Sequence, residues 1–346
     1  MSGETLGFGI VGCGLISQFH GQAIRHTAGA QLISATDLNT ERLQKFCSEF
    51  GCEPAPSFEA MLEDPRVQVI NVCTPNALHA QFAVPAMDAG KHVVVEKPPE
   101  MTLEKCDQML AARDRNGVKL AICLQCRMRK ATRAIKKAID DGRFGRIMAA
   151  DTYMKWYRSM DYYLMDDWRQ KRDQGAGVTI QHAFHYIDLL HHLAGEVSTV
   201  QAFMTNLAHP EVQLEDTLFA HLEYANGAQG IVEATTACWP GIDVRIEING
   251  ENGTAIMVGE RIVTWEFRDK QPGDEQMTRI GSAEVKTGAT GAADLGWHDH
   301  AEVMADMIAA IREDRSPYIS LESARGTLAI ALAMYESADT GRRVSL

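Results

Sequence analysis

The chain has 346 residues and a formal net charge of −12, with 45% hydrophobic and 23% charged residues. These proportions are those of an ordinary globular protein, and the length is typical of two domains. An acidic chain without a basic block repels the phosphates of nucleic acids, so we expect no nucleic-acid partner. No signal segment precedes the first apolar run, and no apolar run reaches the roughly eighteen residues of a membrane span. We therefore expect no membrane partner and a cytoplasmic location.

The first predicted elements are a strand, a glycine turn, a helix and a second strand that ends in an acid. Residues 6–11 and 31–36 are the two apolar runs, and Asp37 follows the second. In this arrangement the turn lets the backbone approach a pyrophosphate, the helix N-terminus offers oriented N–H groups, and the acid binds the ribose hydroxyls. We therefore expect a dinucleotide bound by Gly12, Gly14, Leu15, Ile16 and Asp37, with Ser17 standing where a third glycine is common.

The acid also predicts which dinucleotide binds. The 2′-phosphate of NADP would face the Asp37 carboxylate, and two like charges about 4 Å apart repel by about 1–4 kcal/mol. Leu38 and Asn39 bring no cation that would offset this repulsion. The sequence therefore favours NAD over NADP.

Strands alternate with helices through the first third of the chain, which predicts a doubly wound parallel sheet. Such a sheet binds ligands at the carboxyl ends of its strands. The predicted helices are 40–50, 77–90 and 103–116, and the further predicted strands are 67–73, 92–96 and 118–124.

From about Arg146 the strand-like runs follow one another directly, and Asn226-Gly227 and Asn249-Gly250 are turn dipeptides that join antiparallel strands. This pattern predicts a mostly antiparallel open sheet with helices on one face. We expect two domains, residues 1–125 and 126–346, and a second subunit on the open face, giving a homodimer or homotetramer. The predicted strands are 197–206, 217–224, 230–237, 244–248, 254–258 and 262–267, the helices are 298–313 and 321–340, and residues 270–293 are a polar surface excursion.

The eight cysteines are scattered. Cys123 and Cys126 form one C-x-x-C pair, but no second pair accompanies it, which argues against a structural zinc site. A redox dithiol is the alternative to ordinary reduced thiols packed in the protein. We expect no metal.

Two polar segments follow strands at the edge of the predicted parallel sheet. One contains Thr74, Asn76 and His79, and the other contains Glu96 and Lys97, each with adjacent prolines. Polar residues pinned by proline at strand ends suit rigid ligand loops, although ordinary turns also use proline.

The glycine turn, the Thr74-Pro75-Asn76-x-x-His79 segment and Glu96-Lys97-Pro98 together resemble the glucose–fructose oxidoreductase/inositol dehydrogenase family (Gfo/Idh/MocA). Gly175-Ala176-Gly177, before a helix carrying His185-Tyr186-Ile187-Asp188, is similar to the glycine-rich entry to that family's catalytic helix. The resemblance implies a Rossmann domain followed by an antiparallel substrate domain. It also implies hydride transfer between NAD(P) and a secondary alcohol or ketone of a sugar, polyol or sugar derivative.

The resemblance assigns roles to single residues. Lys97 is the expected catalytic lysine and His185 the expected proton-transfer residue. Gln181 stands where family members commonly have Asp; since an amide cannot transfer a proton, His185 is left as the sole base of this segment. Branches acting on nucleotide-linked amino sugars also have an amide there. The expected cofactor contacts further include Thr74, Asn76, His79, Glu96, Lys97 and Gln125, with Arg127 near both ligands.

Gln181, His185, Asp188 and His192 follow helical spacing and share one stripe. The stripe is either the solvated face of an amphipathic helix or one wall of a polar cleft. Residues 178–195 contain no Lys, Arg or Glu, which favours the cleft. A metal site of His182, His185 and Asp188 is disfavoured, because the two histidines diverge by about 60° around a helix.

The segment from Tyr153 to Trp168 is rich in aromatic residues. Aromatic faces stack on pyranose rings, and arginine binds carboxylates or phosphates. We expect Trp156, Tyr157 and Arg158, with Gln181, to touch the substrate; packing in the core or in a subunit interface is the alternative.

These observations predict an NAD-dependent sugar or polyol dehydrogenase or reductase. His185, with an ordinary pKa near 6.5, takes the hydroxyl proton, and the Lys97 ammonium stabilises the developing alkoxide. The alternatives are an NAD-dependent glycoside hydrolase that acts through transient oxidation and a non-catalytic dinucleotide-sensing protein.

Overall fold

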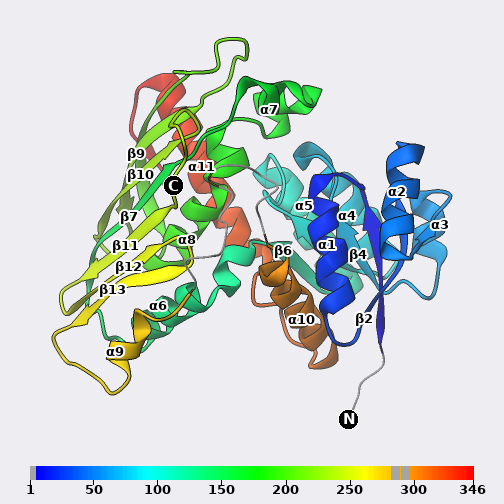
Figure 1. Ribbon diagram of the computed structural model, residues 1–346, viewed down its shortest axis with the longest axis horizontal. Coiled ribbons are helices and arrows are strands. Elements are labelled where there is room, and N and C mark those ends of the chain that lie inside the picture. Colours follow the sequence, from blue (N-terminus) through cyan, green and yellow to red (C-terminus); the bar gives the residue numbers. More distant parts are fainter. Residues whose placement is uncertain (1–4, 282–288, 290–295) are drawn as a thin grey trace. The chain divides into compact units, whose positions relative to one another are not determined.

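The computed structural model describes residues 5–281, 289 and 296–346 (Figure 1). The chain forms two compact units. The first comprises Met1–Gln125 and Trp297–Arg325, and the second comprises Cys126–Gly296 and Gly326–Leu346. Among the described residues, no helix combines the length and the apolar character needed to span a membrane.

The first unit contains a six-stranded sheet in the order β3-β2-β1-β4-β5-β6, and all its pairings among the described residues are parallel. The central strands β1, β4 and β5 are mostly apolar and almost fully buried, as a parallel sheet covered on both faces requires. The chain order reverses between β1 and β4, and ligands bind beside such a switch point at the carboxyl ends of the strands. The strands are β1 (Leu6–Val11), β2 (Ala30–Thr36), β3 (Glu53–Pro54), β4 (Val69–Val72), β5 (His92–Glu96) and β6 (Leu120–Cys123).

Helices connect these strands, so the predicted doubly wound sheet is confirmed. The helix that follows β2 begins with an Asn39 side chain that accepts the N–H of Arg42, and it ends at Gly51 in the left-handed conformation. The helices are α1 (Leu15–His26), α2 (Thr40–Phe50), α3 (Phe58–Glu63), α4 (His79–Asp88), α5 (Leu103–Asn116) and α10 (His298–Arg312), with a 3-10 turn at Asn76–Leu78.

The domain division differs from the predicted one in one segment. The chain passes from the first unit to the second between Gln125 and Cys126, but Trp297–Arg325 returns to the first unit, whereas the sequence analysis placed it in the second. The physical reason is that α10 packs against α1 and buries Met304 and Met307, while Ile122 donates its N–H to the carbonyl of Ile319.

The second unit contains an eight-stranded sheet in the order β13-β12-β11-β7-β10-β9-β8-β14. β7 and β10 run parallel, and the other pairings among the described residues are antiparallel. No strand was predicted from the sequence for β7, which lies in the middle of the sheet. The strands are β7 (Ile147–Lys155), β8 (Val197–Thr205), β9 (Thr217–Tyr224), β10 (Gln229–Thr235), β11 (Arg245–Gly250), β12 (Gly253–Val258), β13 (Arg261–Phe267) and β14 (Val344–Ser345).

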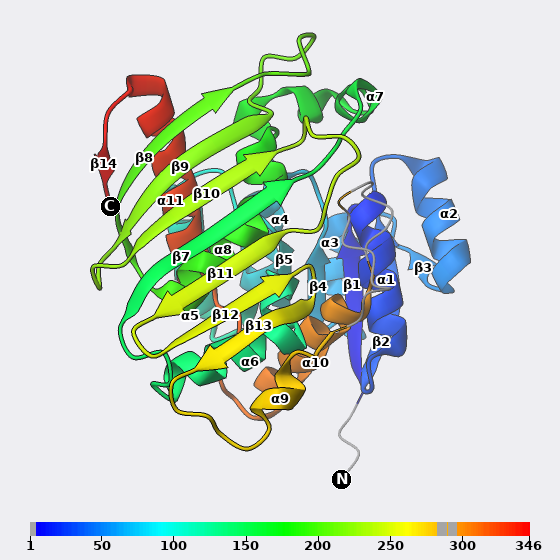
Figure 2. The same ribbon diagram turned by 60° about the vertical axis from the view of Figure 1, so that its left-hand side comes forward.

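Helices cover one face of this sheet, as predicted, and the other face is bare of helices in Figure 2. The covered face buries a large apolar core that includes Ile187, Val232 and Ile248. The helices are α6 (Lys130–Asp140), α7 (Met160–Leu164), α8 (Phe184–Ala194), α9 (Asp274–Met277) and α11 (Leu321–Thr340). Of the polar segment 270–293, residues 282–288 and 290–293 lie outside the described residues.

The single helix expected across residues 178–195 is interrupted. Residues Val178–His182 form a π-helical turn, and α8 begins only at Phe184. The reason lies in Glu215, whose backbone carbonyl accepts the N–H of Val178 and whose carboxylate accepts the N–H of Thr179. A side chain at Gly177 would meet the same carboxylate at 2.4 Å, so only glycine fits there. Gln181 and His185 therefore lie on either side of the interruption.

Candidate functional site

The glycine turn fits a dinucleotide at two positions. Gly12 has a φ of +90°, and a Cβ there would lie 2.7 Å from the carbonyl oxygen of Cys73. At Gly14 a Cβ would meet no described atom within 4 Å, which leaves open space beside the start of α1. No described side chain caps the amides of Leu15 and Ile16 at that start. The turn thus presents helix amides to an open space of the kind that holds a pyrophosphate.

Ser17 and Asp37 fix the shape of this turn. Ser17 is fully buried and donates its hydroxyl to the carbonyl of Gly14 at 2.6 Å. The Asp37 carboxylate accepts the N–H of Cys13 at 2.7 Å and that of Asn39 at 2.7 Å. A carboxylate oxygen can accept more than one hydrogen bond, so both oxygens still have capacity for ribose hydroxyls.

His79 joins the two other edge loops of the first sheet. Its ring is fully buried, with Nδ1 lying 2.8 Å from the carbonyl of Pro98 and Nε2 lying 3.2 Å from that of Thr74. Burial lowers the pKa of His79, so the neutral ring carries a single N–H and donates it to only one of these two carbonyls. Asn76 is also buried, while the Thr74 hydroxyl has no hydrogen-bond partner among the described residues. His79 is therefore built to hold the loops, and Thr74 offers a polar group at the strand end.

Glu96 anchors the loop that carries Lys97. Its Oε2 accepts the backbone N–H of Lys97 at 3.0 Å, and its Oε1 lies 2.7 Å from Nε2 of His20. Burial of the carboxyl group opposes ionisation, but the hydrogen bond and the charge of His20 outweigh it and hold the pKa of Glu96 well below its ordinary value. Gln125, after β6, is buried beside Cys123. The half-buried Lys97 thus directly follows β5, and its backbone N–H is bound by the Glu96 carboxylate.

In the second unit the predicted helical stripe divides into two kinds of residue. Gln181 and His185 are half-buried, whereas Asp188 is fully buried. Asp188 accepts two hydrogen bonds from Arg127, at 2.8 and 2.5 Å, and one from Thr327 at 2.9 Å. Arg127 and Asp188 therefore form a structural ion pair, and the disfavoured metal site loses its carboxylate.

The remaining polar residue of the stripe, His192, is also half-buried. Burial lowers its pKa to about 4, so the neutral ring is a weaker base than an ordinary histidine. This difference leaves His185 as the candidate base of the stripe.

Of the four predicted substrate residues, Trp156 and Arg158 are buried, while Tyr157, like Gln181, is half-buried. Trp156 is buried in the core, with its ring edge-on to Tyr186 at 5.8 Å, so core packing explains most of its surface. Tyr157 is half-buried and packs edge-on against Trp239 at 5.1 Å. Arg158 is only 5% exposed, and its guanidinium lies 5.0 Å from the ring of Trp156. Burial lowers the pKa of Arg158 from its ordinary value.

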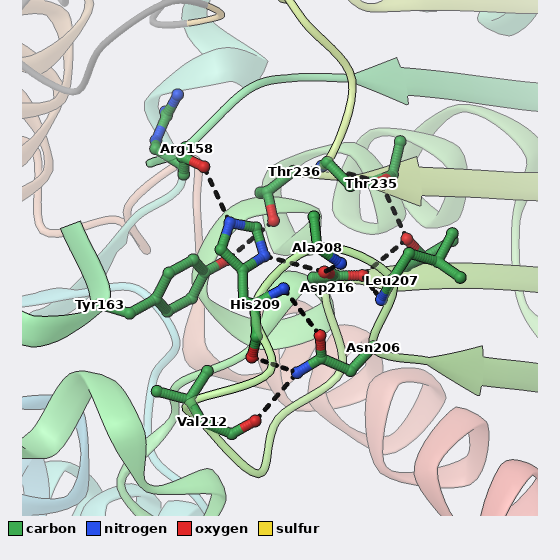
Figure 3. Close-up of polar contacts among 12 residues, drawn as sticks. Arg158, Tyr163, Asn206, Leu207, Ala208, His209, Val212, Asp216, Thr235 and Thr236 are labelled. Atoms are coloured by element: carbon green, nitrogen blue, oxygen red, sulfur yellow. Dashed lines mark hydrogen bonds and ion pairs between the residues drawn. The ribbon is translucent and has the colours of Figure 1, made fainter. Parts of the chain in front are cut away.

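The sequence analysis missed the polar network that holds the backbone at Arg158, shown in Figure 3. Nε2 of His209 donates to the carbonyl of Arg158 at 2.8 Å, and Nδ1 donates to Asp216 at 2.8 Å. Asp216 also accepts the backbone N–H groups of Leu207 and Ala208. Burial opposes the charge on His209, but Asp216 raises the pKa of its ring. The His209–Asp216 pair therefore fastens the 206–216 loop to the residue with the buried guanidinium.

The structure groups the predicted residues by unit. The glycine turn, Asp37, Thr74, His79 and Lys97 all follow strands of the parallel sheet at their carboxyl ends. Lys97 belongs to the first unit and His185 to the second. A cavity of about 260 Å³ in the second unit contains none of the predicted residues; it is lined by Arg172, Asn206, Glu215 and Asp339 among others.

Comparison with known proteins gives matches to both units. Residues 6–123 match the family described as "Oxidoreductase family, NAD-binding Rossmann fold", and residues 132–256 match the "GFO/IDH/MocA C-terminal domain". Levoglucosan dehydrogenase of Pseudarthrobacter phenanthrenivorans is 32% identical over 253 residues, which cover 65% of this chain and 64% of that enzyme. Inositol 2-dehydrogenase of Rhizobium meliloti is 25% identical over 269 residues, covering 76% of this chain and 78% of the relative.

Solved structures also match over the whole chain. The WlbA dehydrogenase from Bordetella pertussis, in complex with NADH and UDP-GlcNAcA, superposes with a TM-score of 0.90 at 32% identity. The match covers 100% of this chain and 99% of that one.

Proposed function

Because the chain belongs to the Gfo/Idh/MocA family of NAD-binding oxidoreductases, we propose that it transfers a hydride between NAD and a secondary alcohol or ketone carbon of a sugar derivative. The observation that carries the proposal is the edge of the first sheet. There an uncapped glycine turn, Asp37 and the Glu96-anchored Lys97 all follow parallel strands. Bound NAD supplies the hydride acceptor, and the protein's residues bind the dinucleotide and manage the charge and the proton.

Lys97 is the proposed charge-stabilising residue. Its backbone N–H is fixed by Glu96, so the side chain starts from a defined point at the end of β5. A lysine ammonium beside the reacting oxygen stabilises the negative charge that develops as the hydroxyl proton leaves. The loops that bind the cofactor near Lys97 are proposed to include four further residues: Thr74, Asn76, His79 and Gln125.

His185 is the proposed base. In the direction of oxidation His185 takes the proton from the hydroxyl oxygen, while the hydride leaves the carbon that bears this hydroxyl. In the direction of reduction His185 returns that proton. Gln181, on the preceding π-helical turn, is proposed to donate or accept a hydrogen bond with the sugar, because its amide does not titrate.

The proposed substrate is a nucleotide-linked sugar acid of the UDP-GlcNAcA type. The WlbA structure that contains UDP-GlcNAcA matches this chain over its full length. Arg158 supports the same class, since a buried guanidinium among aromatic rings is suited to a carboxylate or phosphate. A free anhydrosugar such as levoglucosan is the second candidate, supported by the relative of that name.

We also propose that the chain assembles through the bare face of its eight-stranded sheet. Exposed apolar side chains from five strands lie on the sheet: Met148, Phe203, Phe219, Ile231 and Val263. Apolar side chains spread over an open sheet mark an interaction surface, so a homodimer or homotetramer is expected in light scattering.

The experiment is a substrate panel with NAD and NADP, followed by the absorbance of reduced nicotinamide. UDP-GlcNAcA should give stoichiometric NADH, and levoglucosan and inositol should give less. Release of sugar without accumulation of NADH would instead favour the NAD-dependent glycoside hydrolase. NAD binding with no turnover of any member, unchanged by loss of Lys97 or His185, would favour a dinucleotide sensor.

A further inference from the structure

Four side chains of metal-binding type converge in the interior of the first unit. They are His20 on α1, Glu96 at the end of β5, Cys123 at the end of β6, and His300 on α10. All four are buried, and one donor atom from each lies within 4.8 Å of every other. The cluster combines two imidazoles, a thiol and a carboxyl group from four separate elements. This composition differs from that of an exposed cluster of acidic side chains.

We propose that this cluster binds one Zn²⁺ ion. Imidazole nitrogen, thiolate sulfur and carboxylate oxygen are the three ligand types that zinc uses in proteins, and four such ligands complete a tetrahedral structural site. The charges also balance, because one thiolate and one carboxylate neutralise a divalent cation while two neutral imidazoles add nothing. A site without net charge avoids the cost of burying an unpaired ion.

The donor spacing is close to what zinc requires. Bond lengths of about 2.0–2.3 Å place tetrahedral donor atoms about 3.3–3.8 Å apart. Nε2 of His300 already lies 3.7 Å from Oε1 of Glu96. Nε2 of His20 lies 2.7 Å from the same oxygen, in a hydrogen bond, so this pair must open by roughly half an ångström. Small rotations of the two side chains provide such a movement.

Neighbouring groups hold the donors in place, as outer partners do in zinc sites. Glu96 is fixed through its other oxygen by the N–H of Lys97 at 3.0 Å. The His20 ring is fixed at Nδ1 by the Asn71 amide at 2.8 Å. A half-turn of that amide lets its oxygen accept Nδ1–H, which leaves Nε2 of His20 with the lone pair that a metal needs. His300 is held by stacking on Phe19 at 6.0 Å.

The ion would have a structural role. Four protein donors leave no open position for a substrate, which distinguishes a structural zinc site from a catalytic one. The ligand Glu96 directly precedes Lys97, so the metal would fix the strand end from which the proposed catalytic lysine extends. The alternative is a metal-free hydrogen-bond network centred on Glu96. The zinc content of the purified protein distinguishes this network from a zinc site.

The test begins with metal content and needs no turnover. The purified full chain is dialysed against Zn²⁺ and then against buffer, and zinc is counted per chain; the expected result is one. Replacement by Co²⁺ should give the near-ultraviolet band of a thiolate bound to cobalt. Less than a tenth of an equivalent of zinc, together with no thiolate band, would overturn the proposal and leave the hydrogen-bond network.

Variants separate the site from adventitious binding. Cys123→Ala should lower zinc affinity at least tenfold and abolish the cobalt band, whereas Cys106→Ala, which removes another fully buried thiol of the same unit, should change neither. Asn71→Leu, which removes only an outer partner, should lower affinity about 10–100-fold. Equal loss in the Cys106 control, or zinc retained at full affinity without Cys123, would contradict the assignment. If Cys123→Ala fails to fold, the cobalt spectrum of the unmodified chain still decides.

Discussion

The two units of this protein place their polar side chains by different means. In the first unit the candidate ligands follow strand ends, and short hydrogen bonds to nearby backbone hold them, as Asp37 shows with Asn39 and Glu96 with Lys97. In the second unit the corresponding contacts join distant segments, such as Arg127 with Asp188, which are 61 residues apart. The topology of the parallel sheet thus brings the strand-end residues of the first unit to one edge, with the buried His20–Glu96 contact added to it. In the second unit, buried polar pairs such as His209–Asp216 hold the loops.

The largest effect should come from the second unit's proposed base. His185→Gln keeps the size and hydrogen bonding of the side chain but cannot take up a proton, so kcat should fall about 10²–10⁴-fold. The NAD dissociation constant should stay within a few-fold, as measured by fluorescence titration. His221→Gln, on the exposed sheet surface, is the matched control and should leave kcat unchanged. Full activity of the His185→Gln variant would contradict the proposal that His185 is the base.

The next effect concerns stability, where the two units should differ most. Asp188→Ala leaves the Arg127 guanidinium buried without its carboxylate, and breaking a buried pair in this way costs about 3–5 kcal/mol. The measurement is the free energy of unfolding by urea. The comparison variant, Asp166→Ala, removes the ion pair between Arg169 and Asp166, whose carboxylate is about half exposed. This change should lower the free energy of unfolding by about 1 kcal/mol or less. Similar costs for the two variants would show that the Arg127–Asp188 pair is not the structural element described here.

A smaller change is expected at the ribose end of the first unit. Asp37→Ala removes the charge that repels a 2′-phosphate, so the preference for NAD over NADP should narrow by about fivefold or more, given a repulsion of about 1–4 kcal/mol. The ratio of kcat/KM for the two dinucleotides measures this, with the exposed Asp114→Ala as the control. An unaltered ratio would place the carboxylate away from the ribose.

The smallest effect is a pH dependence of stability from the loop pair of the second unit. The folded-state pKa of His209 is raised above 6.5, so the pair stabilises the fold below that value and loses this contribution as the pH rises through the raised pKa. Asp216, with its pKa lowered to about 2, loses its contribution only in strong acid. His209→Gln should therefore cost about 1–3 kcal/mol near pH 6 and less near pH 9. An equal cost at both pH values would mean that the His209 ring is uncharged.

The sequence predicted the architecture well where short-range signals act. The glycine turn, the alternation of strands and helices, and the run of antiparallel strands identified both sheets, and the resemblance identified the family that the comparisons confirm. The strand β7 was not predicted because Ala149, Ala150 and Asp151 are residue types that are uncommon in strands. Trp297–Arg325 was assigned to the second unit because no local pattern shows that α10 packs against α1. The interruption of the helix at His182 depends on Glu215, more than thirty residues away, which no periodicity reveals.

For the candidate site, the sequence pointed to the residues that directly follow strand ends. It did not point to the residues whose hydrogen bonds hold the loops in place. His79 is predicted to touch the cofactor, and its buried ring also lies against the carbonyls of Thr74 and Pro98, which the sequence did not predict. His209 and Asp216 had no recognisable spacing, since their partner is the backbone of Arg158. The absence of a metal was expected from the single C-x-x-C pair, yet the ligand set proposed here takes Cys123 with residues 20, 96 and 300. Donors this far apart in the chain leave no motif.

A double-mutant cycle on kcat/KM with Lys97→Ala and His185→Gln tests most directly whether these two residues act together in the proposed hydride transfer. Lys97→Ala alone should lower kcat about 10²–10³-fold, as removal of one charge-stabilising donor does. If both residues act on the same oxygen, the account predicts that the double variant is about as slow as the slower single variant. Penalties that simply multiply would contradict the account, because independent residues are expected to give additive free energies.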